Sequence, residues 1–143
     1  MGFVEVEVTL SNPAARERWA TARLLVDTGA TLSWLPRSTL ESIGVAPLSR
    51  RGFLLADGRR VERETGGIIL ALDGVAIAVT VVFAEAGEGF VLGVTALEAP
   101  GLAVDPVERK LLHRDLLAMG ARRSDVGEYL YGAPAQARMT GRP

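Results

Sequence analysis

The sequence lacks cysteine altogether, and it contains a single histidine, His113, among 143 residues. The absence of cysteine excludes disulfide bonds, zinc–thiolate sites and thiol catalysis. A metal site would therefore have to rest on carboxylates alone, and we interpret His113 as a solvated residue at the end of a strand. We expect no metal and no organic cofactor.

The sequence also lacks an excess of charge and a long apolar run. Sixteen basic and seventeen acidic residues give a formal net charge of −1, so electrostatics favour neither nucleic acid nor an anionic membrane as a partner. The longest apolar stretch, Val75–Ala84, is interrupted by Thr80 and is far shorter than the ~20 residues of a membrane helix. The start, MGFVEVEVTL, does not have the regions of a signal peptide. We expect a soluble, cytoplasmic protein.

Short strands dominate the pattern that remains. Val4, Val6 and Val8 alternate with polar residues, as in a half-buried strand, and Ala20–Asp27 predicts a second strand. Two Asp-Gly pairs, at residues 57–58 and 73–74, lie between β-compatible runs and predict hairpins with type I′ turns. The sequence therefore predicts a mostly antiparallel β domain.

Helices are predicted to be few and short. Pro36 can occupy a first helical turn, and Gly44 is well placed to end that helix. Further along, the pattern predicts a strand at Phe90–Leu92, a helical turn at Thr95–Ala99, and two strands at Leu102–Asp105 and Lys110–Leu112. Asp105, which precedes Pro106, is interpreted as a residue that opens a turn.

One segment carries unusual chemistry. The apolar strand Leu24–Val26 runs directly into Asp27-Thr28-Gly29-Ala30. A carboxylate beside buried residues requires a partner charge, hydrogen-bond donors or a shared proton, and glycine permits a tight turn that offers backbone N–H groups to it. The tripeptide alone is also compatible with an ordinary turn between strands.

The order of the pieces around this segment resembles the retropepsins, the single-lobed aspartic proteases of retroviruses and their cellular and bacterial relatives. The resemblance covers about residues 3–112. It rests on Leu24–Ala30, the apolar segment Leu32–Leu35, the hairpins at Asp57-Gly58 and Asp73-Gly74, and Val91-Leu92-Gly93 before a short helix. It implies a closed antiparallel β-barrel of the retropepsin type, with one or two short helices, that acts as a homodimer.

The resemblance also implies a role for each matched residue. Asp27 would be the catalytic carboxylate, and the substrate-binding residues would be Gly29, Ala30, Asp57, Gly58, Arg59 and Leu92. Thr28 would bond to its copy in the partner subunit beneath the site, and Gly93 would allow a close backbone approach. Residues 56–60 would form the tip of a flap that closes over bound peptide.

The chain has one Asp-Thr-Gly, whereas aspartic proteolysis needs two carboxylates. A homodimer that hydrolyses a peptide or an unfolded protein substrate is therefore the expected form. Viral members of the family often pair an acidic residue, two places after the motif glycine, with an arginine directly after the second glycine. The corresponding residues here are Thr31 and Val94, so both partners of that ion pair are missing, which fits a cellular or bacterial member. The flap is unusual too, since Asp57, Arg59 and Arg60 replace a glycine-rich tip.

Two other interpretations stay open. The chain could be a retropepsin-fold peptide-binding or dimerisation module without proteolysis, or an unrelated β-barrel with an accidental motif. We divide the chain into a protease domain, residues 1–113, and a C-terminal extension, residues 114–143, whose pattern is weak. Trp34 is interpreted first as a core residue and second as part of a substrate pocket, and the pairs Arg50-Arg51 and Arg122-Arg123 as solvated surface.

Overall fold

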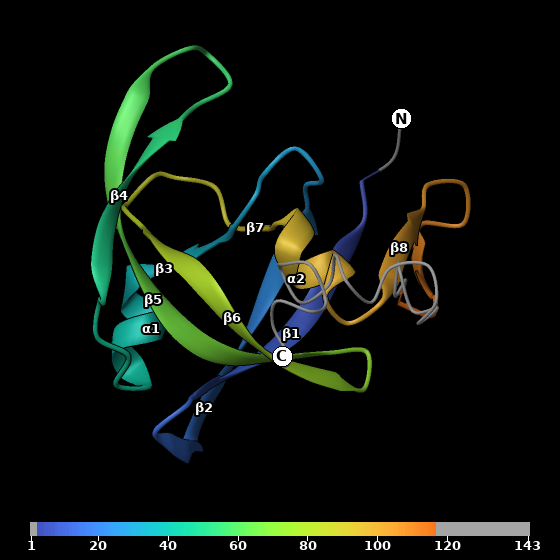
Figure 1. Cartoon of the computed structure of the whole chain (residues 1–143), viewed down its shortest axis with the longest axis horizontal. Coiled ribbons are helices and arrows are strands. Elements are labelled where there is room, and N and C mark those ends of the chain that lie inside the picture. Colours follow the sequence, from blue (N-terminus) through green and yellow to red (C-terminus); the bar gives the residue numbers. More distant parts are fainter. Residues whose placement is uncertain (1–2, 117–143) are drawn as a thin grey trace, which may run out of the picture.

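The computed structural model describes residues 3–116, and the C-terminal extension from residue 117 lies outside the described residues. Strands predominate, and Figure 1 shows a curved sheet with a ribbon of two strands, β4 and β5, that rises away from it. The elements follow in the order β1 (Glu5–Asn12), β2 (Ala15–Val26), β3 (Ser33–Pro36), α1 (Arg37–Ser42), β4 (Ser49–Leu54), β5 (Arg60–Leu72), β6 (Val75–Ala84), β7 (Val91–Leu92), α2 (Val94–Glu98), β8 (Leu102–Asp105) and β9 (Lys110–His113).

The first hairpin leads the chain to the Asp-Thr-Gly motif. β1 and β2 pair antiparallel around a turn at Asn12, whose side-chain oxygen accepts a hydrogen bond from the Ala14 N–H at 2.9 Å. Both predicted strands are confirmed, but β2 begins at Ala15, five residues earlier than the predicted Ala20. β2 ends at Val26, so Asp27 is the first residue beyond the strand.

Within residues 3–116 the main sheet has seven strands in the order β1-β2-β7-β3-β6-β5-β4. β1 also pairs with β5 at residues 9–11, which joins the two sides of the sheet. Most pairs are antiparallel, as predicted, but β2 pairs with β7, and β3 with β6, in parallel, which departs from the expected antiparallel barrel. Each parallel pair joins segments far apart in the sequence, and no turn between neighbouring strands can indicate such a pairing.

The two Asp-Gly pairs form different turns. Asp73 and Gly74 both have positive φ, 53° and 84°, as the predicted type I′ turn requires. At the other pair only Gly58 has positive φ, 89°, so the type I′ prediction is wrong there. The loop is longer than two residues: the Gly58 N–H donates to the Leu55 carbonyl, and the Leu55 N–H donates to the Arg59 carbonyl.

Both predicted helices are present and short. α1 begins directly after Pro36, and Gly44, with φ of 81°, follows its end. α2 begins at Val94, one residue earlier than predicted, because Gly93 stays extended and serves as its first flanking residue. Among residues 3–116 no helix is long and apolar enough to cross a membrane.

The core lies inside the curved sheet and under the two helices. Its fully buried side chains come from α1 and from all strands of the main sheet except β4, and each stabilises the fold by about 1.5–3 kcal/mol relative to an exposed position. The largest are Leu10, Leu24, Leu35, Leu40, Ile68, Leu70, Phe83 and Leu92. The hairpin of β8 and β9 lies on the side of the molecule away from the β4–β5 ribbon (Figure 1).

Candidate active site

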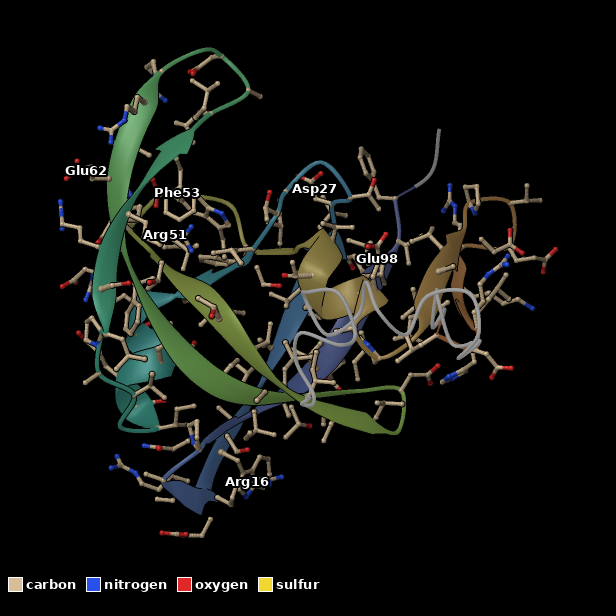
Figure 2. All side chains as sticks on the ribbon, viewed as in Figure 1. Arg16, Asp27, Arg51, Phe53, Glu62 and Glu98 are labelled. Atoms are coloured by element: carbon tan, nitrogen blue, oxygen red, sulfur yellow. The ribbon has the colours of Figure 1, made fainter. Side chains whose placement is uncertain are left out.

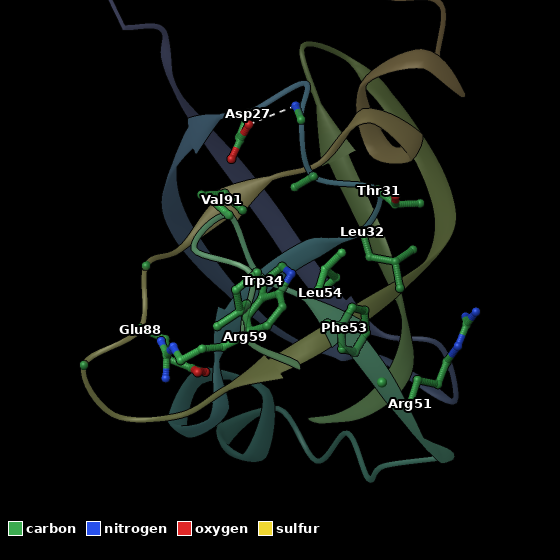
Figure 3. A pocket seen from close by; sticks show the side chains of 17 residues that line it. Asp27, Thr31, Leu32, Trp34, Arg51, Phe53, Leu54, Arg59, Glu88 and Val91 are labelled. Atoms are coloured by element: carbon green, nitrogen blue, oxygen red, sulfur yellow. Dashed lines mark hydrogen bonds between the residues drawn. The ribbon is translucent and has the colours of Figure 1, made fainter. Parts of the chain in front are cut away.

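Asp27 lies at the start of a tight loop, held by main-chain bonds on both sides. Its own N–H donates to the Leu92 carbonyl at 3.0 Å, and its carbonyl accepts the Ala30 N–H at 3.1 Å. One carboxylate oxygen, Oδ1, accepts the Gly29 N–H at 2.9 Å. The loop therefore orients an exposed carboxylate and leaves the second oxygen outside these bonds (Figure 3).

A second segment, residues 92–95, crosses directly beneath this loop. The Val94 N–H donates to the Ala30 carbonyl at 2.7 Å, and the hydroxyl of Thr95 donates to the Thr31 carbonyl at 2.8 Å. Gly93 donates its N–H to the hydroxyl of buried Ser33 at 2.9 Å. A Cβ atom on Gly93 would lie 2.5 Å from the carbonyl of Leu32, so only glycine fits there. The predicted close approach at Gly93 is present.

Asp27 faces a cavity of about 840 Å³ between its loop and the β4–β5 ribbon. This volume lies within the range of ligand-binding clefts. The walls come from three segments and four further side chains: residues 29–32, residues 51–56, residues 87–89, and Trp34, Arg59, Val91 and Asp27 itself.

The middle of the cavity wall is aromatic. The rings of Trp34 and Phe53 are 5.3 Å apart and meet edge to face at 67°, which is a favourable arrangement. Figure 3 shows the two rings side by side, with Asp27 above them. Trp34 is thus half-buried and faces the cavity, which agrees with the second interpretation of this residue rather than with the core alone.

The loop between β6 and β7 closes one end of the cavity and is fixed by ion pairs. Both oxygens of Glu88 accept from Nε of Arg63 at 3.1 Å, and Oε1 also accepts the Glu85 N–H at 2.7 Å. Arg63 holds the pKa of the Glu88 carboxyl below its usual range. Glu85 accepts from Arg37 at 2.9 Å, which lowers the pKa of Glu85 in the same way.

The tip of the ribbon carries a further ion pair. Asp57 accepts the backbone N–H of Arg59 at 3.0 Å and its side-chain Nε at 2.8 Å, and these two bonds lower the pKa of Asp57. Arg59 also lines the cavity, whereas Asp57 and Gly58 lie at the tip and do not. The tip is thus ordered by its own side chains as well as by glycine.

The structure brings three of the six predicted substrate-binding residues to the cavity, and Leu92, like Asp57 and Gly58, does not line it. Gly29, Ala30 and Arg59 line it together with Asp27. Leu92 does not, because it has no exposed surface and packs in the core. Residues alternate in direction along a strand, so it is the neighbouring Val91 that faces the cavity.

Several cavity residues were not predicted from the sequence. The sequence predicts Arg51 on the solvated surface and indicates no role for Phe53 or Glu88, yet all three line the cavity. Their positions depend on the curvature of the β4–β5 ribbon and on the fold of the loop at residues 85–89. One signal was available: Arg51 and Phe53 alternate along a strand beside the predicted flap.

The other polar residues singled out earlier lie elsewhere. His113 is exposed and lies 2.8 Å from Asp73, so it links β9 to the β5–β6 turn. Asp105 accepts the N–H groups of Val107 and Glu108, as expected of a residue that opens a turn. Within residues 3–116 no three metal-ligating side chains gather in one place.

Comparison with known proteins identifies the fold. No protein-family model matches the sequence, and no curated protein matches it. Among solved structures, the chain is similar to the EIAV protease complexed with the inhibitor HBY-793, with a TM-score of 0.50 and 18% sequence identity. The similarity covers 68% of this chain and 88% of the viral one. At this identity the similarity establishes the fold and not the activity: the chain has the fold of a retroviral protease.

Proposed function

We propose that the chain is one subunit of a homodimeric aspartic endopeptidase of the retropepsin type, a cellular or bacterial relative of the viral enzymes. The observation that carries the proposal is the position of Asp27 in the wall of a peptide-sized cavity, in a chain with the fold of a retroviral protease. The pairing of β1 with β5 supports a closed barrel at residues 1–113, with residues 114–143 as an extension. The cytoplasmic location remains a prediction.

In the proposed dimer, two Asp27 carboxylates face each other across a two-fold axis and share one proton. The ionised carboxylate accepts a proton from a water molecule, which attacks the carbonyl carbon of the peptide bond. The protonated carboxyl donates to the carbonyl oxygen as the tetrahedral intermediate forms. Proton transfer to the departing amine then breaks the C–N bond.

The neighbouring residues have supporting roles in this proposal. The Gly29 N–H already holds one oxygen of Asp27, so it fixes the direction in which the other oxygen points. Thr28, which is exposed and does not line the cavity, would bond to its copy in the partner subunit. Residues 56–60 would close over the peptide as a flap.

The test is cleavage of a fluorogenic peptide library by wild-type protein and by Asp27→Asn. We expect the variant to lose at least ~10³-fold in kcat/KM, because it cannot supply the ionised carboxylate. Asp73→Asn is the matched control, since Asp73 is an exposed aspartate in a turn that asparagine also favours. Wild-type turnover by Asp27→Asn would refute the proposal.

A mixing experiment tests whether the site is shared between subunits. When Asp27→Asn is mixed with an equal amount of wild type and the dimers re-equilibrate, about one quarter of them carry two native aspartates. Activity should therefore fall with the square of the wild-type fraction. A linear fall would place the whole site within one chain.

The alternative is a peptide-binding module without proteolysis, and the ribbon tip favours it. The Asp57–Arg59 pair orders a segment that a protease flap has to move. Peptide binding by the wild type, with no cleavage at any pH, would decide for the module.

A further inference from the structure

One cation of the cavity wall has no counter-ion among residues 3–116. Four charged side chains line it: Asp27, Arg51, Arg59 and Glu88. Glu88 is bound by Arg63, and Arg59 is bound by Asp57. Arg51 forms no ion pair with any of residues 3–116.

Strand register places Arg51 on the face of the ribbon that looks into the cavity. It lies directly opposite Arg63 across β4 and β5, and Phe53 lies opposite Val61. Their neighbours Arg50 and Glu62 point outward and form an ion pair with each other. Figure 2 shows Phe53 and Arg51 on the side of the ribbon toward Asp27 and Glu62 on the outer side.

Arg51 and Arg63 lie directly opposite each other on neighbouring strands. Two like charges directly opposite on neighbouring strands destabilise the pair. Glu88 neutralises Arg63, but no residue among 3–116 does the same for Arg51. An anionic group from outside these residues that enters the cavity would therefore meet an arginine that has no ion pair among residues 3–116.

We infer that Arg51 selects substrates that carry a carboxylate side chain two residues from a large apolar one. The inference rests on the proposed function. Arg51 and Phe53 are two residues apart on β4, so their side chains lie about 7 Å apart along one face. A peptide bound in extended form has the same repeat, so its acidic side chain meets Arg51 when its apolar side chain meets the Trp34–Phe53 wall.

The geometry sets both the chemistry and the spacing. A guanidinium group binds a carboxylate through two parallel N–H···O bonds, and an amide cannot replace the charge in that contact. With an acidic residue immediately next to the apolar one, the two side chains of an extended peptide would point to opposite faces. Spacing is therefore as diagnostic as charge.

The experiment uses peptides that differ at one position. Each carries leucine and, two residues away, either glutamate, glutamine or lysine, and a fourth peptide has glutamate next to leucine. We expect wild type to prefer glutamate over glutamine by roughly five- to tenfold in kcat/KM, and only at the two-residue spacing. Arg51→Gln should abolish this ratio, and Arg51→Glu should favour lysine instead.

Arg50→Gln is the matched control. Arg50 precedes Arg51 on the same strand, points to the opposite face and is paired with Glu62, so its loss should leave the glutamate preference intact. An equal loss of the preference in Arg50→Gln and Arg51→Gln would show a general effect of charge and would overturn the inference.

A binding measurement separates this inference from the proposed function. Asp27→Asn is titrated with the same peptides, labelled with fluorescein, and the Kd ratio for glutamate against glutamine is read from anisotropy. A ratio that depends on Arg51 without any cleavage by wild type would sustain the inference and reject the protease. Cleavage with a ratio that Arg51→Gln leaves unchanged would reject the inference and sustain the protease.

Discussion

The side of the cavity that carries Asp27 is held by main-chain hydrogen bonds and buried atoms, whereas the opposite side is held by charged side chains. Residues 92–95 bond to the Asp27 loop and the residues that follow it through backbone groups and two hydroxyls, those of buried Ser33 and of Thr95. Across the cavity, Arg63 and Glu88 fix the loop at residues 85–89, and Asp57 and Arg59 order the ribbon tip. Substitutions on the first side therefore meet steric contacts, whereas the stability of the second side depends on pH and salt.

Gly93→Ala should cause the largest loss of stability, on the side of the cavity held by main-chain bonds. The added Cβ would lie 2.5 Å from the carbonyl carbon and oxygen of Leu32 and 2.9 Å from the Ala30 oxygen. Backbone φ at Gly93 is −85°, which alanine adopts freely, so the steric contact alone determines the cost. We expect a loss of about 3 kcal/mol and a fall in Tm of about 10 °C by thermal unfolding.

Gly89→Ala is the control for that prediction. Gly89 also lies beside the cavity, but a Cβ there would have no atom within 4 Å. Its Tm should stay close to wild type. A similar Tm loss in both variants would mean that glycine matters for chain flexibility rather than for close approach.

Ser33→Ala should have an intermediate effect. It removes the hydroxyl that accepts the Gly93 N–H and leaves that buried donor without its partner. The expected loss is about 1–3 kcal/mol by urea unfolding. Ser38→Ala, at an exposed position in α1, should change stability by a few tenths of a kcal/mol at most. A loss below that of the control would show that the N–H finds another acceptor.

The smallest effect concerns pH and the charged side of the cavity. Arg63 lowers the pKa of Glu88 in the folded protein. The contribution of this pair to stability is therefore complete at pH values above the pKa of a glutamate in the unfolded chain, about 4.3. It is lost as pH falls through the lowered folded value. Glu88→Gln should therefore lower stability at neutral pH and make its decline below about pH 4.3 shallower.

Urea unfolding between neutral and acidic pH measures this slope. Glu98→Gln is the control, since Glu98 is exposed on α2 and has no ion pair within residues 3–116. It should retain the wild-type slope. A Glu88→Gln slope identical to wild type would assign the acid sensitivity to other carboxylates, with Glu85 the first to examine.

Local signals were enough to predict much of the fold. The alternation of apolar and polar residues predicted β1. Asp73-Gly74 predicted the turn between β5 and β6, where both residues have the positive φ of type I′. The same dipeptide at residues 57–58 misled, since Asp57 lacks positive φ and the chain makes a longer loop. The parallel pairs β2–β7 and β3–β6 leave no short-range mark in the sequence.

The site divides along the same line. The contact between Asp27 and Gly29 could be predicted because it is local: the N–H of Gly29, two residues further on, donates to the Asp27 carboxylate. Glu88 and Arg63 were not found, because they meet only after residues 25 positions apart are brought together. Leu92 was predicted to bind substrate, but its side chain points into the core. The resemblance to a family could not specify that direction.

The crossing of residues 92–95 beneath the Asp27 loop also sets the order in which the molecule is completed. Gly93 and Thr95 bond to residues 60 and 64 positions earlier. Contacts of such long range form late in folding, and on the ribosome they wait until the later segment has emerged. We expect a chain released short of residue 95 to leave Asp27 on an unsupported loop. The loop that carries the carboxylate would then gain its support only after nearly all of the described part of the chain has been synthesised.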